Sequence, residues 1–300
     1  MGYEISYKTN YGIMYHSKCE GILSDPYLDT FPAVNLILTS PPFPLNRAKQ
    51  YGNMTGQEYL EWLQKLAILF SRVLAGDGSI VIELGNAWES GKPVQSTLPI
   101  ESLLAFKAAG NFFLCQEFIH YNPARLPSPI EWVNKKRIRV KDSFTRIWWL
   151  SKVPNPKANN KEVLAPYSKQ MQKLLESGRY NSGKRPSEYS IGATSFINDN
   201  GGAIPSNVIV ASNTVSNDSY LKYCKEHQYN IHPARMPKEI PEFFIRFLTS
   251  PGDTVMDPFA GSNTTGYIAE QLKRKWIAIE AEQKYIDGSK GRFSNVLFSR

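Results

Sequence analysis

The sequence predicts an α/β protein in which helices cover both faces of a doubly wound sheet. Short apolar runs typical of buried strands alternate with segments whose apolar residues recur at helical spacing, and this alternation favours parallel strands. Hydrophobic residues make up 42% of the chain, so its 300 residues can form a sizeable core. A chain of this length suits one large domain or two modest ones.

The first half of the chain carries the clearest alternation. Residues 34–39 are mostly apolar and lead into a proline-rich turn, which predicts a buried strand. Thr55 and Glu58 have capping-box spacing, and the apolar residues that follow keep helical spacing as far as Val73. The Gly76-Asp77-Gly78 stretch predicts the end of this helix. The alternation continues with strands over 79–84, 112–121 and 143–151 and a helix over 100–109.

After about residue 152 the pattern weakens, and it resumes near Pro241. A polar linker leads to a short helix over 168–177, and residues 181–217 are rich in Ser, Asn, Gly and Pro. This stretch predicts a smaller irregular region, or an array of loops in place of a domain. The regular pattern then returns as a helix near 243–248, a strand over 254–257, a helix over 263–273 and a strand over 276–280.

Positive charge is concentrated in one part of the chain. Residues 121–186 hold 15 lysine and arginine residues and 4 acidic residues, a net charge of +11, which leaves −3 for the rest because the whole chain carries +8. Aromatic residues are interspersed among these charges. Such a segment is a footprint for a polyanion, although a solvated charged face has the same composition.

Cysteine and histidine usage indicates the compartment. Cys19, Cys115 and Cys224 form no Cys-x-x-Cys pair, and their odd number argues against a disulfide framework. The four histidines form no metal-binding pattern. No apolar run reaches the roughly 18 residues of a membrane span, and residues 1–10 lack a signal-peptide core. We expect a soluble cytoplasmic protein with reduced thiols and no metal.

A turn near the C-terminus has the character of a nucleotide site. The strand ending at Asp257 runs into the small-residue turn 258–266 and then a helix, where free backbone N–H groups can approach a ligand. The next strand ends at Glu280, 23 residues after Asp257, where an acid suits a ribose diol. The turn is neither a Walker A loop nor Gly-x-Gly-x-x-Gly, and an ordinary βα turn is the alternative.

A second turn, Thr39-Ser40-Pro41-Pro42-Phe43, follows the first strand. Ligands of open α/β sheets bind at the carboxyl ends of strands. The two prolines fix the backbone, so Ser40 and the Pro41 carbonyl offer two acceptors beside the ring of Phe43. This arrangement suits an amino group on a planar heterocycle. A simple loop or an exposed polyproline ligand are the alternatives.

Together the two turns resemble a known family. Ser-Pro-Pro-Phe at 40–43, followed much later by Asp-Pro-Phe-x-Gly-Ser-x-Thr-Thr-Gly at 257–266, is similar to the amino-methylating DNA methyltransferases. The order of the motifs resembles their permuted beta class, and the Ser-Pro-Pro-Phe form resembles the N4-cytosine branch. The resemblance implies a Rossmann-like fold of the S-adenosylmethionine-dependent type. It divides the chain into a catalytic half (1–152), a target-recognition region (153–230) and a cofactor-binding half (231–300).

The resemblance also implies site residues. It assigns catalysis to Ser40, Pro41, Pro42 and Phe43, and S-adenosylmethionine binding to Asp257, Pro258, Phe259, Gly261, Ser262, Asn263, Thr264, Glu280 and Pro237. Two positions depart from the family pattern. The segment 15–18 lacks the acid that relatives often place before the catalytic strand, which leaves an acidic cofactor contact there in doubt. Asn263 stands where many relatives have glycine, and asparagine tolerates positive φ better than most residues.

The implied reaction is methylation of an exocyclic amine. Ser40 Oγ and the Pro41 carbonyl would accept the hydrogens of the cytosine amino group, which localises its lone pair for attack on the sulfonium methyl group. Phe43 would stack on the base, which must leave the duplex to be reached. Methylation at cytosine C5 requires a cysteine after a proline in that family. It is set aside, because Lys18, Leu114 and Tyr223 precede the three cysteines.

Double-stranded DNA is the expected partner. Arg179, Lys184 and Arg185 are the candidates for reading bases, because arginine forks suit guanine edges. The resemblance implies a restriction–modification system in a bacterial or archaeal cytoplasm, with a cognate endonuclease as functional partner. A monomer and a dimer both stay open.

Three other functions stay open at this point. The first keeps the fold and methylates adenine N6, for which Asp-Pro-Pro-Tyr is the usual motif. The second is a nucleotide-dependent DNA-binding regulator without catalysis. The third is a dinucleotide-dependent oxidoreductase, which the absence of Gly-x-Gly-x-x-Gly disfavours.

Overall fold

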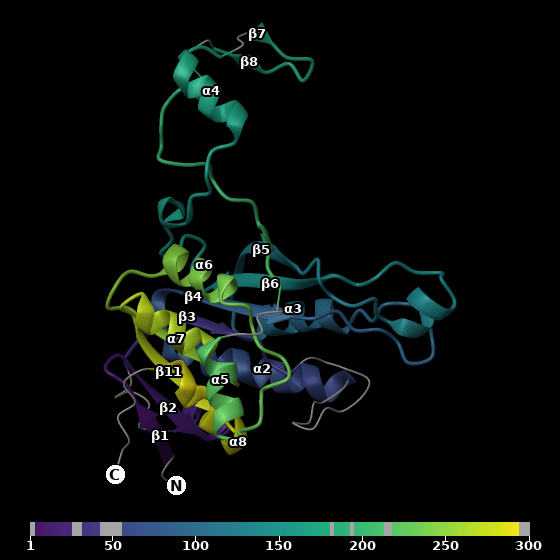
Figure 1. Ribbon diagram of the computed structural model, residues 1–300, viewed down its shortest axis with the longest axis vertical. Helices are drawn as coiled ribbons and strands as arrows, with labels where there is room; N and C mark the ends of the chain where they lie inside the picture. The colour runs from purple at the N-terminus through teal and green to yellow at the C-terminus, as the bar shows by residue number, and fades with distance from the viewer. Residues whose placement is uncertain are drawn as a thin grey trace. The chain divides into compact units, whose positions relative to one another are not determined.

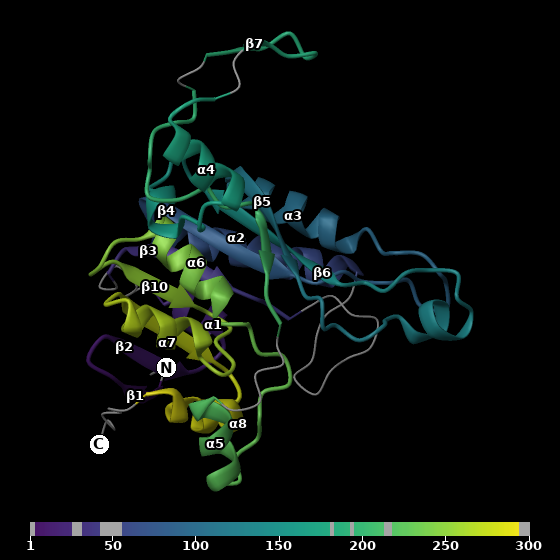
Figure 2. The same ribbon diagram turned by 45° about the horizontal axis from the view of Figure 1, so that its top comes forward.

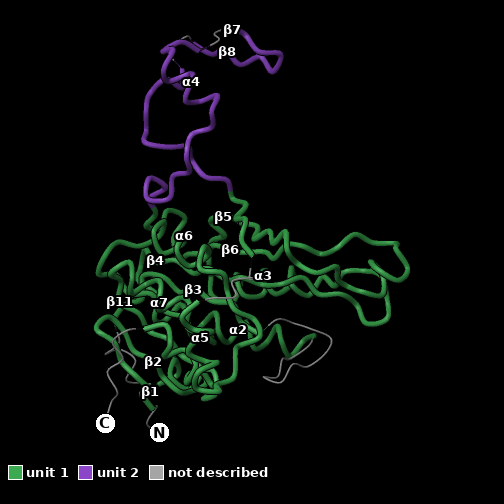
Figure 3. Tube along the Cα trace, viewed as in Figure 1, with its two compact units in different colours: residues 1–158, 207–300 green, residues 159–206 purple. Residues whose placement is uncertain are grey.

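The computed structural model describes residues 4–25, 32–42, 56–180, 183–192, 195–212 and 218–293. The chain forms two compact units, coloured separately in Figure 3. Unit 1 comprises residues 1–158 and 207–300, and unit 2 comprises residues 159–206. No helix in the described ranges is both long and apolar enough to cross a lipid bilayer.

Unit 1 is built on a sheet whose described strands run in the order β1-β2-β11-β10-β3-β4-β6-β5-β9 (Figure 1). Five neighbouring strands are mutually parallel: β2, β11, β10, β3 and β4. Strands β1 and β6 run antiparallel to their neighbours. Their bounds are β1 Glu4–Lys8, β2 Gly12–His16, β3 Val34–Thr39, β4 Leu74–Leu84, β5 Phe113–Tyr121, β6 Phe144–Ser151, β9 Val208–Val210, β10 Thr254–Asp257 and β11 Lys275–Glu280.

Helices cover both faces of this sheet, so the predicted α/β class is confirmed (Figures 1 and 2). One face carries α1 (Cys19–Leu23), α2 (Gly56–Val73) and α3 (Leu98–Ala109). The other carries α6 (Glu239–Leu248), α7 (Thr264–Gln271) and α8 (Gln283–Ser289), and α5 (Ser219–Glu226) packs against α8.

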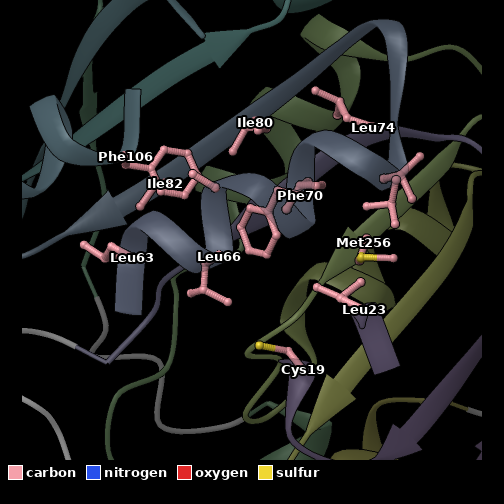
Figure 4. Packing of buried hydrophobic residues seen from close by; sticks show 14 of the residues in the cluster. Cys19, Leu23, Leu63, Leu66, Phe70, Leu74, Ile80, Ile82, Phe106 and Met256 are labelled. Carbon is pink, nitrogen blue, oxygen red and sulfur yellow. The ribbon is translucent and has the colours of Figure 1, made fainter. Parts of the chain in front are cut away.

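The apolar stripe of α2 explains why this helix docks where it does. Leu63, Leu66 and Phe70 recur at helical spacing and are buried against Ile80 and Ile82 of the sheet (Figure 4). Burying a side chain of this size contributes about 1.5–3 kcal/mol, so the layer is held mainly by apolar burial. On the other face of the sheet, α6 buries its apolar side chains in the same way.

The register of the parallel strands brings their carboxyl ends to one edge. Met256 lies beside Ile37, Thr39 beside Ile82, and Asp257 beside Ala278. Consequently the last residues of β11, β10, β3 and β4 face the same end of unit 1. The antiparallel strand β6 contributes its first residues to this edge, and β5 contributes its last.

Unit 2 is small and irregular. It contains the short helix η3 (Asn160–Val163), α4 (Lys169–Ser177) and the two-stranded ribbon of β7 (Gly183–Lys184) and β8 (Ser190–Ile191). Ser168 caps α4 by accepting a hydrogen bond from the Met171 N–H. Among the described residues of unit 2, no hydrophobic side chain is buried, so the unit has no apolar core there.

Two elements differ from the sequence predictions. Strand β4 begins at Leu74 directly after α2, so Gly76-Asp77-Gly78 lies within the strand and not in a turn that precedes it. Residues 208–210 form β9, which pairs with β5 at the sheet edge. The predicted recognition region 153–230 is therefore wider than unit 2, because β9 and α5 belong to unit 1.

Candidate active site

A cavity of about 550 Å³ opens at the carboxyl edge of the sheet. This volume lies within the roughly 300–1,000 Å³ range of small-molecule sites. Its lining includes eleven of the residues predicted from sequence: Ser40, Pro41, Pro42, Pro237, Asp257, Pro258, Phe259, Gly261, Ser262, Thr264 and Glu280. The two turns that lie far apart in sequence thus border one cavity.

The remaining predicted residues are placed elsewhere. Phe43 lies outside the described residues. Asn263 is fully buried and does not line the cavity. Arg179, Lys184 and Arg185 belong to unit 2, where Arg179 and Lys184 are exposed and Arg185 lies 5.7 Å from the Tyr180 ring centroid.

The turn that contains Ser40 is anchored by a neighbouring strand. Thr39, the last residue of β3, is fully buried and donates a hydrogen bond from Oγ1 to Asp257 Oδ1 at 2.8 Å. Pro41 is buried, whereas Ser40 and Pro42 are half-buried. The turn is therefore fixed at its base by a neighbouring strand, and Ser40 stays accessible from the cavity.

Asp257 joins the two turns. Its carboxylate accepts hydrogen bonds from Thr39, from Thr265 Oγ1 at 2.7 Å and from the Phe259 N–H at 3.1 Å. Burial raises its pKa from 3.8 to about 6, although these three donors oppose the shift. Asp257 therefore ties β3, β10 and the first turn of α7 together.

Gly261 and Glu280 close the other end of the cavity. The Gly261 N–H donates to Glu280 Oε2 at 2.7 Å, and the Glu282 N–H donates to Oε1 at 2.9 Å. Burial raises the pKa of Glu280. Gly261 has φ of +53°, and a Cβ there would lie 3.0 Å from His232 Nε2. Glycine is therefore required both by the backbone and by the close approach of His232.

Asn263 has a structural role and does not face the cavity. Its φ of 53° lies in the left-handed region, as the sequence suggested it could tolerate. Its side chain accepts from the Gly266 N–H at 3.1 Å and donates to Tyr7 Oη at 3.0 Å. Asn263 thus caps α7 and links it to β1, and it shapes the turn from behind.

Sequence reasoning missed an acid on the cofactor side. The segment 15–18 has no carboxylate, but Glu20 at the start of α1 lines the cavity and accepts a hydrogen bond from Trp62 Nε1. Trp62 packs in turn against Phe259, with ring centroids 5.5 Å apart. The acid stands in the short helix α1 and not in segment 15–18. A search restricted to the ends of strands therefore does not find it.

It also missed a buried polar cluster at the opposite end. Glu83, His120 and Thr145 line the cavity and are each at most 6% exposed. Glu83 Oε1 lies 2.7 Å from His120 Nδ1 and accepts from Thr145 Oγ1 at 2.7 Å, while His120 Nε2 lies 3.2 Å from the Ala211 carbonyl. Both ring nitrogens therefore lie within hydrogen-bond distance of an oxygen acceptor, which fixes the orientation of the imidazole ring.

Known proteins resemble this chain over most of its length. The family model described as DNA methylase (N6_N4_Mtase) matches residues 34–291. The type II methyltransferase M.PvuII of Proteus hauseri is 45% identical over 296 residues, which covers 97% of this chain and 86% of that protein. M.BglII of Bacillus subtilis is 27% identical over 259 residues, covering 85% of this chain and 62% of that protein.

Solved structures of DNA methyltransferases also match most of this chain. PvuII DNA methyltransferase (cytosine-N4-specific) matches with a TM-score of 0.77 and 37% identity, covering 98% of this chain and 91% of that chain. The M1.HpyAVI–SAM complex matches with a TM-score of 0.55 and 20% identity, covering 94% and 98%. At that identity the second match concerns the fold alone.

Proposed function

This chain belongs to the DNA methylase family, and we propose that it transfers a methyl group from S-adenosylmethionine to the N4 amino group of cytosine in duplex DNA. It is a DNA methyltransferase, and its 45% identity to M.PvuII favours cytosine N4 over adenine N6. The observation that carries the proposal is the convergence of the Ser40 and Gly261 turns on one cavity. The chain does not fit an oxidoreductase or a regulator without catalysis.

The half of the cavity near β10 and β11 suits S-adenosylmethionine. Gly261 lines this half and lets the turn approach His232 closely, and Glu280 presents a carboxylate where ribose hydroxyls can donate. Phe259 and Trp62 offer flat apolar faces, and Glu20 offers a second carboxylate toward a cationic group. When bound there, S-adenosylmethionine supplies an electrophilic methyl group on a sulfonium.

The half near β3 and β4 suits the target base. Ser40 Oγ and the Pro41 carbonyl can accept the two amino hydrogens of cytosine, because the proline turn holds both at the cavity wall. With those hydrogens engaged, the nitrogen lone pair is less delocalised into the ring. Glu83, His120 and Thr145 form a fixed polar wall behind this subsite. Catalysis then rests on positioning and preorganised polar groups.

The motif order supports assignment to the permuted beta class, because the catalytic turn precedes the cofactor turn in the chain. The basic surface of unit 2, with Arg179, Lys184 and Arg185, is where we place recognition of the DNA sequence. The likeness to a type II methyltransferase supports a modification role in a restriction–modification system, which would act on chromosomal DNA in a bacterial or archaeal cytoplasm.

The test expresses the chain in a host free of N4-methylcytosine and measures modified nucleosides by mass spectrometry. We expect N4-methylcytosine with the wild-type chain and none with Ser40→Ala. Long-read sequencing of the same DNA gives the recognition site. Formation of N6-methyladenine alone would refute the choice of base, and the absence of any methylated base would refute the function.

A further inference from the structure

An unusual arm extends from unit 1 beside the cavity. Antiparallel neighbours such as β5 and β6 can be joined by a turn of about two residues. Here the chain instead runs from Asn122 to Ser143 before β6 begins, and this segment projects away from the sheet at the right of Figure 1. We call residues 122–143 the arm. Long connections of this kind inside compact domains are usually functional.

The arm is an ordered structure. Its two sides are joined by backbone hydrogen bonds from Asn122 N–H to the Ser143 carbonyl at 2.9 Å and from Asp142 N–H to the Ser128 carbonyl at 3.0 Å. Lys141 Nζ donates to the Pro123 carbonyl at 3.0 Å. Asn86 donates to the Asp142 carboxylate at 2.9 Å, which ties the arm to the segment after β4. A surface held in this way can present side chains in fixed positions.

The charge of the arm fits a polyanion. It contains six basic residues and two acidic ones: Arg125, Lys135, Lys136, Arg137, Arg139 and Lys141, against Glu131 and Asp142. Glu131 already pairs with Lys135 at 3.1 Å and Lys136 at 3.8 Å, and Asp142 is engaged by Asn86. Excess positive charge therefore remains on the arm, which complements the phosphates of a duplex.

The arm also exposes aliphatic side chains that a solvated loop would not need. Leu126 is 80% exposed and Val140 is 86% exposed. Their neighbours in sequence are in contact, because Lys141 Nζ lies 3.4 Å from the Arg125 carbonyl. Leu126 and Val140 therefore stand on adjoining sides of the arm. Exposed aliphatics on a basic surface are the features with which DNA-binding proteins wedge between base steps.

The position of Leu126 links this surface to the reaction. Arg125, its immediate neighbour, lines the cavity and donates to the Phe144 carbonyl at 3.0 Å. A base that enters the cavity leaves a gap in the duplex stack at the cavity mouth, and unstacking that base costs free energy. An aliphatic side chain one residue from the cavity wall is placed to occupy that gap.

We propose that the arm is a second DNA-binding surface, on which Leu126 fills the space vacated by the target cytosine while Arg137 and its basic neighbours contact the flanking phosphates. This inference rests on the proposed function, because it requires a base to leave the duplex. The arm would lower the free-energy cost of moving the cytosine out of the duplex. This role does not depend on the chemistry of methyl transfer.

The test measures single-turnover methyl transfer to two duplexes that carry the recognition site found by sequencing. In one the target cytosine is paired with guanine, and in the other it faces an abasic position, so that extrusion is already cheap. We expect Leu126→Ala to lose about tenfold in rate on the paired duplex, because part of the unstacking cost is no longer offset, and to stay within about twofold of wild type on the abasic duplex.

Leu104→Ala is the matched control. Leu104 is 60% exposed on α3, none of whose residues lines the cavity, so its truncation should change neither rate. A Leu126→Ala variant equal to wild type on the paired duplex would overturn the proposal, as would an equal loss on both duplexes. A change in oligomeric state by sedimentation with unchanged DNA kinetics would identify the arm as a protein interface and would also overturn it.

A second readout addresses the phosphate contacts. Arg137→Gln should weaken duplex binding at all sequences and reduce the slope of log K against log salt by about 0.9, the value for one lost phosphate contact. Lys107→Gln on α3 removes one positive charge away from the cavity and should leave the slope unchanged. An identical slope for Arg137→Gln and wild type would refute the phosphate contact. Failure of the proposed function is distinguishable, because the wild-type chain would then transfer no methyl group.

Discussion

The two halves of the cavity are built in different ways. The cofactor half is formed mainly by two adjacent strand ends, where Asp257 is buried, Glu280 is half-buried, and both carboxylates accept hydrogen bonds from backbone or threonine donors. The base half draws Ser40 from the turn after β3, and Glu83, His120 and Thr145 from β4, β5 and β6. The first half depends mainly on consecutive segments near the C-terminus, with Glu20 and Trp62 added from α1 and α2, whereas the second exists only when distant segments are assembled.

This difference implies that substitutions in the two halves have separable effects. Changes in the base half should lower the rate of methyl transfer or the stability of the fold while leaving cofactor affinity intact. Changes in the cofactor half should raise the dissociation constant for S-adenosylmethionine and leave the rate at saturation nearly unchanged. Each of the following experiments tests whether effects on rate or stability are separate from effects on cofactor affinity.

The largest effect is expected for Ser40→Ala. Removing an acceptor for the amino hydrogens should lower the single-turnover rate by about 10³-fold, in the range found when one preorganised polar group is deleted from an active site. Calorimetric titration should give a dissociation constant for S-adenosylmethionine within about twofold of wild type. A variant that keeps a tenth of the wild-type rate would remove Ser40 from the reaction.

The next effect concerns His120. Its replacement by alanine leaves the buried Glu83 carboxyl without its hydrogen-bond partner in His120, which should lower the free energy of unfolding by about 3 kcal/mol. Urea unfolding measures this loss. Adding Glu83→Gln to His120→Ala should restore more than half of it, because the unpaired charge is gone. If the double variant is less stable than the single one, the loss does not come from the unpartnered Glu83 carboxyl.

Asp257 should produce a pH-dependent effect. Since burial raises its pKa from 3.8 to about 6, the folded protein binds this proton more tightly than the unfolded chain within that window. The contribution of Asp257 to the free energy of unfolding therefore falls as pH rises from about 4 to 6, by about 3 kcal/mol, and is constant above pH 6. Urea unfolding of wild type and Asp257→Asn from pH 4.5 to 7.5 measures the difference. A difference that does not vary with pH would contradict the assignment.

The smallest effect is expected for Glu280→Gln. The amide oxygen can accept only one of the two backbone N–H groups, from Gly261 and Glu282, that the carboxylate holds, and it is a weaker acceptor for ribose hydroxyls. The dissociation constant for S-adenosylmethionine should rise about tenfold, equivalent to about 1.4 kcal/mol, with an unchanged rate at saturation. Glu282→Gln removes a nearby charge that pairs with Lys284 and should raise it much less. Equal effects of the two variants would indicate a general loss of negative charge.

Much of the site could be predicted from sequence because its residues stand at strand ends. An apolar run followed by a turn indicates both the strand and the edge at which it ends, and this reasoning placed Ser40, Pro41, Gly261 and Glu280 at the cavity. Asn263 is an instructive exception. The same turn contains it, but its side chain points into the core and holds Tyr7, so adjacency in sequence did not imply exposure to the ligand.

The sequence by itself determined the alternation of strands and helices, the two turns and the concentration of positive charge, because periodicity and turn chemistry are local properties of the chain. Only the tertiary structure decided that Glu83, His120 and Thr145 meet, that Glu20 reaches the cavity from α1, and that Arg125 roots the arm beside it. These contacts depend on strand order and register, above all on the insertion of antiparallel β6 between β4 and β5. Burial of apolar surface fixes that order, and residues far apart in the sequence become neighbours only once it is fixed.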